Sequence, residues 1–170
     1  NPGFEQSFTG WVRWDANNAI VPDARSGTKA VRLGTAASGI GQGLAATPGQ
    51  NYSLTAYAKR QNSSANAVLG LTFFDDQWRG INAQSVANIN SSNYATYTVS
   101  GVAPANARYA IAWVSKQAAD SGYVFADDFC LTGASSGGAV SASLRQNADG
   151  TWSSAEAVRS FETYLPLLAN

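Results

Sequence analysis

The chain has 170 residues, of which 45% are hydrophobic and only 13% are charged, and its 11 Lys and Arg balance its 11 Asp and Glu. This composition supports a folded domain with a sizeable core, and the zero net charge gives no basis for binding nucleic acid or an anionic membrane. There is no histidine and one cysteine, Cys130, which excludes an internal disulfide, a cysteine zinc cluster and histidine-dependent nucleophilic catalysis. Any metal is therefore expected to be a hard cation bound by oxygen atoms.

Short segments in which apolar and polar residues alternate fill the chain up to about residue 132 and predict β-strands. In chain order, the predicted strands are residues 8–14, 30–33, 39–44, 52–60, 68–74, 81–86, 96–100, 108–115 and 123–131. Turn-forming residues separate several of them, as at 47–51 and 103–106. About nine short strands with no helix between them predict an all-β fold, a β-sandwich of the jelly-roll kind.

Alternation also assigns the two faces of some predicted strands. In strand 52–60 the apolar phase runs through the even-numbered residues, and Tyr57 and Lys59 point the other way. In strand 68–74 the apolar phase runs through residues 69, 71 and 73, and Phe74 opposes it. Tyr57 and Phe74 are thus expected outside the core, and they would form one surface if their strands are neighbours. Strand 108–115 is apolar on both phases, which leaves its orientation open.

The composition changes after residue 131. Residues 133–138 are Gly, Ala and Ser only and predict a flexible linker, and residues 140–144 could form a strand. A capping box at 153–156 precedes Val158, Phe161 and Leu165, whose spacing predicts a helix that ends at Pro166. We therefore divide the chain into a sandwich (1–133), a linker (134–138) and a helical tail (139–170), which is either the beginning of a following domain or a helix docked on the sandwich.

Four segments carry a resemblance to a known family. They are residues 1–5 (NPGFE), 26–33 (SGTKAVRL), 47–54 (TPGQNYSL) and 126–131 (ADDFCL). In this order and spacing, over residues 1–133, they resemble the jelly-roll carbohydrate-binding modules of the family 4, 9 and 22 type. The resemblance implies a secreted, non-catalytic monomer that targets a polysaccharide-degrading enzyme to its substrate, attached to the catalytic domain of a glycoside hydrolase or polysaccharide lyase.

The same resemblance implies a structural calcium ion that pins the amino-terminal strand against the last one. The expected ligands are the carboxylates of Glu5 and Asp127 and the backbone carbonyls of Gly3, Ser26 and Lys29. Alternation favours Asp127 over Asp128, because it places Asp127 on the side of Phe129 and Leu131, facing the sandwich. The alternative is that these carboxylates are solvated strand ends.

Proteins bind sugars by stacking aromatic rings on their apolar C–H faces and by bonding their hydroxyls with polar groups. The candidate residues are Tyr57, Trp78, Arg79, Phe74, Lys59, Trp113 and Trp14. Trp78 is the strongest single candidate, because it lies in a polar loop where burial is hard to arrange; the alternative is a lid on the core. Trp11, beside Gly10, is expected in the core.

Two pairs of neighbouring carboxylates, Asp75–Asp76 and Asp127–Asp128, raise the question of a glycosidase. Adjacent residues on a strand point to opposite faces, so neither pair suits two catalytic carboxylates across a cleft. We therefore expect no catalysis. The alternatives are a catalytic jelly-roll polysaccharide lyase or hydrolase, which would use Tyr with Arg or Lys, and a structural spacer or adhesion sandwich. Arg79, Lys59 and Arg13 could bind an anionic polysaccharide, so the sequence leaves open whether the sugar is neutral or charged.

Overall fold

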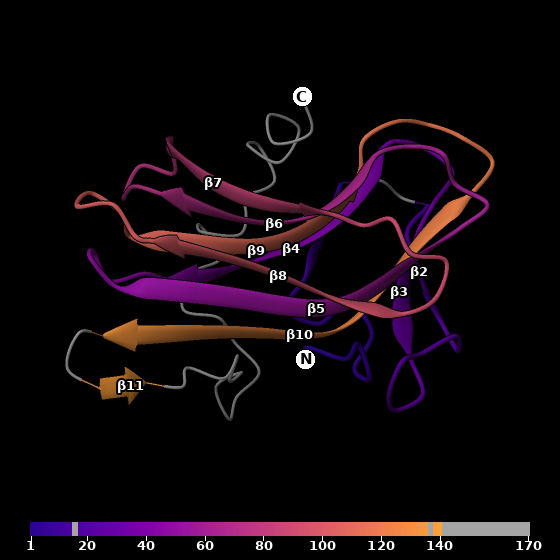
Figure 1. Ribbon diagram of the computed structural model, residues 1–170, viewed down its shortest axis with the longest axis horizontal. Coiled ribbons are helices and arrows are strands. Elements are labelled where there is room, and N and C mark those ends of the chain that lie inside the picture. The colour runs from indigo at the N-terminus through magenta and orange to yellow at the C-terminus, as the bar shows by residue number, and fades with distance from the viewer. Residues whose placement is uncertain (15–16, 136–137, 141–170) are drawn as a thin grey trace.

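Two antiparallel β-sheets face each other in the computed structural model, which describes residues 1–14, 17–135 and 138–140 (Figure 1). The strands are β1 (Val12–Arg13), β2 (Ala19–Val21), β3 (Ala30–Leu33), β4 (Ser38–Ala45), β5 (Asn51–Gln61), β6 (Ala67–Phe74), β7 (Gly80–Asn88), β8 (Ala95–Val102), β9 (Tyr109–Lys116), β10 (Tyr123–Ser135) and β11 (Gly138–Val140). Sheet A has the order β1-β4-β9-β6-β7, and sheet B has the order β2-β3-β10-β5-β8, with β11 paired to β10. The predicted all-β sandwich is confirmed.

Eight of the nine predicted strands correspond to β3 through β10. The sequence patterns missed β2, which is three residues long and too short to show alternation. The strand suggested for residues 140–144 overlaps β11 at Val140, and its other residues lie outside the described part of the chain. In the part of the chain that the structure describes there is no helix, and hence none long and apolar enough to span a membrane. The predicted helical tail lies outside the described residues.

The amino-terminal segment is where the strand prediction is wrong. Of residues 8–14, only β1 pairs with β4, and residues 2–10 consist mainly of turns. Positive φ angles at Phe4 (57°), Ser7 (60°) and Gly10 (82°) are incompatible with an extended strand. The turns bring the rings of Phe4 and Trp11 to 5.0 Å and place Trp11 4.8 Å from the Phe129 ring, so Trp11 is in the core as predicted.

The main core lies between the two sheets, and it confirms the phases assigned to two strands. In β5 the even-numbered residues 52–58 are buried, whereas Tyr57 and Lys59 are half-buried on the other side. In β6, residues 69, 71 and 73 belong to the main core. The open case, β9, turns Ala110, Ala112 and Val114 towards this core and the intervening residues outward.

A β-bulge in β10 changes the alternation that sequence reasoning assumed. The pairing with β5 shifts between Asp127 and Cys130, and Asp128 adopts a φ of 51°. As a result Ala126 and Phe129 both face the main core, and Asp127 pairs with Tyr57 on the opposite side of the sheet. The prediction that Asp127 shares the phase of Phe129 and Leu131 is therefore wrong.

Residues 133–135, predicted to open a linker, extend β10 instead. Gly133 pairs with Val140 of β11 on one side and with Tyr52 of β5 on the other. Small residues suit this position, because a Cβ on Gly133 would overlap the Gln50 side chain. Gly138, the last residue of the predicted linker, also belongs to a strand, because it pairs with Ser135 as the first residue of β11. Residues 136–137 of the linker and 141–170 of the tail lie outside the described residues.

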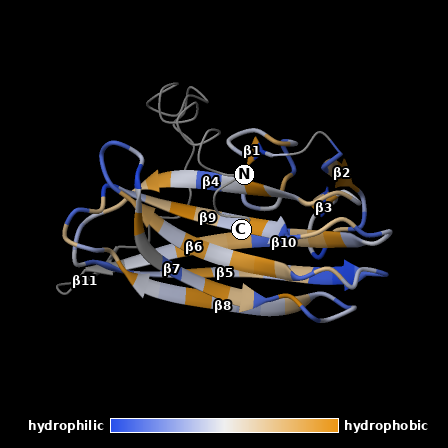
Figure 2. Ribbon diagram, turned by 90° about the horizontal axis from the view of Figure 1, so that it is seen from above, coloured by the Kyte–Doolittle hydropathy of each residue, from blue (hydrophilic) through white to orange (hydrophobic). Residues whose placement is uncertain are grey.

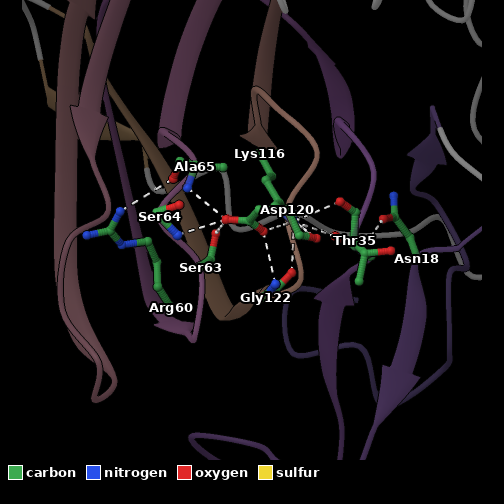
Figure 3. Close-up of polar contacts among 10 residues, drawn as sticks. Asn18, Thr35, Arg60, Ser63, Ser64, Ala65, Lys116, Asp120 and Gly122 are labelled. Atoms are coloured by element: carbon green, nitrogen blue, oxygen red, sulfur yellow. Dashed lines mark hydrogen bonds and ion pairs between the residues drawn. The ribbon is translucent and has the colours of Figure 1, made fainter.

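A buried ion pair, Lys116 with Asp120, ties together three loops at one end of the sandwich (Figure 3). The Lys116 ammonium is 0% exposed and donates to the carbonyls of Gly34, Thr35 and Gly122 at 3.2, 3.0 and 2.8 Å. The Asp120 carboxylate accepts hydrogen bonds from the loop 62–66 as well, including Ala65 N at 2.9 Å. The hydrogen bond from Lys116 holds the pKa of Asp120 well below its usual range, so the Asp120 carboxylate is charged at neutral pH.

Candidate functional site

The outward side of sheet A is defined by four cross-strand rows. Reading from β4 through β9 to β6, the rows are Gly39–Ser115–Val68, Gly41–Trp113–Gly70, Gly43–Ile111–Thr72 and Ala45–Tyr109–Phe74. Their neighbours Ile40, Leu71 and Ala112 belong to the main core, so these rows point away from it. Seen from above, the three strands lie side by side with alternating hydropathy (Figure 2).

Aromatic side chains gather on this face and form a second apolar cluster, separate from the main core. We call it the outer aromatic cluster: Val12, Val68, Phe74, Trp78, Ile111 and Trp113, with Trp14 and Tyr109 packed against it. Four of the seven predicted sugar-binding residues are therefore brought together here. Tyr109 was missed by sequence reasoning, although its shared phase with Ile111 and Trp113 was the available signal.

Glycines form the floor beneath two of these rings. A Cβ on Gly70 would overlap the ring of Trp113, and a Cβ on Gly39 would overlap the ring of Trp14. The rings therefore lie directly on the backbone of β6 and β4, an approach that only glycine permits. The indole Nε1 of Trp113 donates to Thr72 Oγ1 at 2.9 Å, which fixes its ring on the sheet.

Trp78 is placed by the turn between β6 and β7. Its φ of 59° folds the indole back onto Tyr109, whose ring stacks on it at 4.0 Å and an interplanar angle of 12°. Asp75 holds this turn, because its carboxylate accepts from the backbone of Gln77 and Arg79 at 2.9 Å each and from Arg79 Nε at 2.8 Å. The backbone hydrogen bond from Arg79 is the main reason that the pKa of Asp75 is lowered.

The exposure of these candidates differs. Trp78 is only 8% exposed, because its ring folds back over the outer aromatic cluster. It is therefore not the exposed loop residue that the sequence favoured, and it lies closer to the alternative of a lid. Trp113 and Phe74 are buried at 0% and 2%, whereas Trp14 and Tyr109 are half-buried and keep part of their rings at the surface. Arg79 is exposed beside the cluster and paired with Asp75.

Two predicted residues, Tyr57 and Lys59, lie on the outward side of sheet B. The Arg25 guanidinium lies 3.8 Å from the centre of the Tyr57 ring, and Lys59 pairs with Asp23 at 2.7 Å. β5 neighbours β10 and β8, not β6, so the condition for a shared surface of Tyr57 and Phe74 is not met. The predicted set therefore divides between two faces of the molecule.

The residues predicted to bind calcium meet around the loop 25–29. Both carboxylate oxygens of Glu5 accept from Thr28, and Oε1 accepts also from Lys29 N, at 2.6 to 2.9 Å. The amides of Arg25 and Ser26 donate to Asp127 Oδ2 at 2.8 and 3.2 Å. Ser26 and Lys29 thus contact these carboxylates through their backbone N–H groups.

The fit of a cation differs between the two carboxylates. The Glu5 oxygens are engaged by N–H and O–H donors, and the hydrogen bond from the Thr28 side chain is the main cause of its lowered pKa. Asp127 is 0% exposed, and burial raises its pKa. A Cβ on Gly3 would lie 3.5 Å from Oδ1 of both Asp127 and Asp128, so two carboxylates converge there. Among the described residues, no three Asp, Glu, His or Cys side chains lie close enough together to hold a metal ion.

No protein-family model matches the chain, and no curated protein sequence matches it significantly. Among solved structures, Family 16 Carbohydrate Binding Module-2 superimposes with a TM-score of 0.65 at 23% identity, over 77% of this chain and 96% of that one. TmCBM61 in complex with β-1,4-galactotriose gives 0.55 at 17% identity, over 77% and 94%.

The CBM22-1–GH10 modules of a Clostridium thermocellum endo-1,4-β-D-xylanase, complexed with xylohexaose, give a TM-score of 0.59 at 13% identity. The match covers 79% of this chain and 28% of that one. At these identities the similarity concerns the fold. The two sheets of this chain form the β-sandwich of the carbohydrate-binding modules, the fold that its sequence resemblance implied.

Proposed function

We propose that the chain binds a polysaccharide through the outward side of sheet A and does not act on it chemically. The observation that carries this proposal is the outer aromatic cluster, in which aromatic residues from separate parts of the chain meet on a sheet face turned away from the main core. Trp14 and Tyr109 are the half-buried aromatic residues of this cluster, and partly exposed rings suit the apolar C–H faces of sugars. The fold shared with carbohydrate-binding modules supports the same reading.

The charge of this face favours a neutral polysaccharide. None of the outward positions of β4, β9 and β6 in the four rows carries a charged side chain. Arg79, which follows Trp78 in the turn, is already paired with Asp75. An anionic sugar would find no unpaired charge among these rows, whereas a neutral sugar would lose no charge solvation on binding.

The same face argues against hydrolysis. A glycosidase needs two carboxylates across the scissile bond, about 5 to 10 Å apart. The four rows carry no Asp or Glu, and Asp75 is engaged by its own turn. In one comparison structure such a module occurs in one chain with a GH10 module. We infer the same role for this chain: a secreted targeting module attached to a polysaccharide-degrading enzyme.

We further propose that a calcium ion stabilises the sandwich edge, held by Asp127 and Asp128 beside Gly3. The support is the buried Asp127 carboxylate beside Asp128. Backbone amides of Arg25, Ser26 and Asp128 donate to Asp127, and Arg25 pairs with Asp128, yet burial still raises the pKa of Asp127. Calcium prefers such oxygen ligands, and it would tie the amino-terminal segment to β10. Glu5 fits this role less well, because it is not among the carboxylates that converge on Gly3, and Thr28 and Lys29 hold its oxygens.

The test is affinity gel electrophoresis on neutral polysaccharides (xylan, galactan, mannan and β-glucan), with an anionic polysaccharide for comparison. We expect retardation by at least one neutral polymer, lost in Trp14→Ala and Trp78→Ala. Tyr57→Ala, on the outward side of sheet B, is the matched control and should bind as the original chain does. Circular dichroism checks that each variant folds.

Two results would contradict this proposal. Loss of binding in Tyr57→Ala alone would move the site to sheet B. Release of reducing ends or of unsaturated, ultraviolet-absorbing products by the purified chain would establish catalysis.

A further inference from the structure

Two polar atoms on the outward side of sheet A are buried without a hydrogen-bond partner. In the described part of the chain, five buried side-chain atoms lack one: Trp14 Nε1, Arg32 Nε, Ser38 Oγ, Gln42 Oε1 and Ser115 Oγ. Native proteins rarely leave such atoms unpaired, since each costs about 1 to 3 kcal/mol. Trp14 and Ser115 stand out because both belong to the face that we propose as the binding site.

The register places these two groups side by side. Ser115 of β9 pairs directly with Gly39 of β4, and both point outward. The Trp14 ring lies on Gly39, and the backbone N–H of Trp14 donates to Gly39 O at 3.2 Å. Residues paired across an antiparallel ladder have neighbouring side chains. The indole N–H and the serine hydroxyl therefore share one small area of the sheet.

A nearby tryptophan shows what a purely structural arrangement looks like. The indole Nε1 of Trp113 also lies in the outer aromatic cluster, but its donor is taken up by Thr72 Oγ1 at 2.9 Å. The fold therefore satisfies one indole of this cluster internally and leaves the Trp14 indole unsatisfied. An indole N–H can only donate, whereas a serine hydroxyl donates and accepts.

We propose that Trp14 Nε1 and Ser115 Oγ bind hydroxyl groups of the polysaccharide and set how the sugar is oriented on the aromatic face. This inference rests on the proposed function and adds its specificity-determining residues. Both atoms are covered in the unbound chain, so a sugar hydroxyl reaches them only when the half-buried Trp14 ring shifts; it then accepts from the indole N–H and exchanges hydrogen bonds with the serine. A site built in this way discriminates strongly against a sugar that lacks the hydroxyl, because the protein groups are then left unpaired.

The experiment measures binding of Ser115→Ala and Trp14→Phe to the neutral polysaccharides of the panel, by affinity gel and by calorimetry with matching oligosaccharides. Trp14→Phe keeps an aromatic ring and removes the N–H donor. Each variant should bind about fivefold to tenfold more weakly, the usual effect of losing one hydrogen bond. Ser38→Ala is the matched control: this serine is equally buried and unpartnered, but it shares the inward phase of Ile40 on β4.

Thermal unfolding supplies a readout that separates binding from structure. Removing an unsatisfied buried hydroxyl should leave the melting temperature unchanged or raise it. Weaker binding by Ser115→Ala at an undiminished melting temperature, with normal binding by Ser38→Ala, is the expected result.

Other outcomes overturn the proposal in distinguishable ways. If the original chain binds a polymer and Ser115→Ala and Trp14→Phe bind it equally well, the specificity pair is wrong and the proposed function stands. If Ser115→Ala lowers the melting temperature, the hydroxyl has a partner within the protein and the inference fails. If the original chain binds no member of the panel, the proposed function and the inference fail together.

Discussion

Lys116 shows how much a single residue contributes to this sandwich. Its ammonium is surrounded by carbonyl oxygens of two loops and by the Asp120 carboxylate. A buried charge of this kind is stable only when it is fully hydrogen-bonded. The surrounding oxygens in turn depend on the ammonium, since they are turned towards it.

Lys116→Met tests this dependence. The variant removes the ammonium that pairs with Asp120 and leaves the surrounding carbonyls without their donor, so we expect the free energy of unfolding to fall by about 3 kcal/mol. Chemical denaturation measures it. Lys59→Met is the control, because its partner Asp23 has an exposed side chain and such pairs contribute less than about 1 kcal/mol. Equal losses in the two variants would contradict the role assigned to Lys116.

The glycine under Trp113 gives a second prediction at this scale. A methyl group at position 70 would overlap the indole, so Gly70→Ala should displace Trp113 and break its hydrogen bond to Thr72. We expect a loss of about 1 to 3 kcal/mol, as for other overpacked sites, together with weaker polysaccharide binding. Gly80→Ala is matched to it, because its Cβ would make an ordinary 3.9 Å contact with Phe74. Retained binding and stability in Gly70→Ala would show that the ring is free to shift.

At the scale of elements, strands in which apolar and polar residues alternate regularly were predictable from the sequence. The β-bulge and the turns that interrupt this alternation were not. Alternation correctly predicted strands β5 and β6 and the outward orientation of Tyr57 and Phe74. It succeeded because burying one face of a strand requires apolar residues at every second position. It failed at the bulge after Asp127 and in the turns around Phe4, since both depend on positive φ angles at non-glycine residues. It also could not show which strands are neighbours, which is why Tyr57 and Phe74 were considered together.

The proposed calcium ion lies where the amino-terminal segment contacts β10. Pro2 O accepts from Phe129 N at 3.1 Å, and Gly3 lies beside Asp127 and Asp128. Adding calcium to EDTA-treated protein should raise the free energy of unfolding by about 3 kcal/mol when calcium exceeds its dissociation constant a few hundredfold. Differential scanning calorimetry measures the shift.

Two variants assign the ligands. Asp127→Asn should abolish the response to calcium, whereas Glu5→Ala should lower the starting stability and keep the response, because Glu5 bonds to Thr28 and Lys29. A melting temperature that is the same in EDTA and in calcium would refute the site. A response lost in Glu5→Ala but kept in Asp127→Asn would return the role to Glu5.

At the scale of the whole molecule, the main core and the outer aromatic cluster are built from residues 4–131. β10 continues to Ser135 and pairs with β11, so a boundary at residue 133 would cut through a strand. The sheets of the described structure are complete at Val140. To test whether the tail is separable from the sandwich, the chain should therefore be truncated after residue 140 rather than after residue 133.

We expect the chain that ends at Val140 to unfold in one cooperative transition with a midpoint within a few degrees of the full chain. Both apolar clusters and the cross-strand pairs formed by the described residues remain in it. Scanning calorimetry of both chains checks this. A chain that ends at residue 133 loses the β10–β11 pairing and should melt at a lower temperature. If the longer truncated chain loses its cooperative transition, residues 141–170 contribute to the fold, and the tail is not a separable segment.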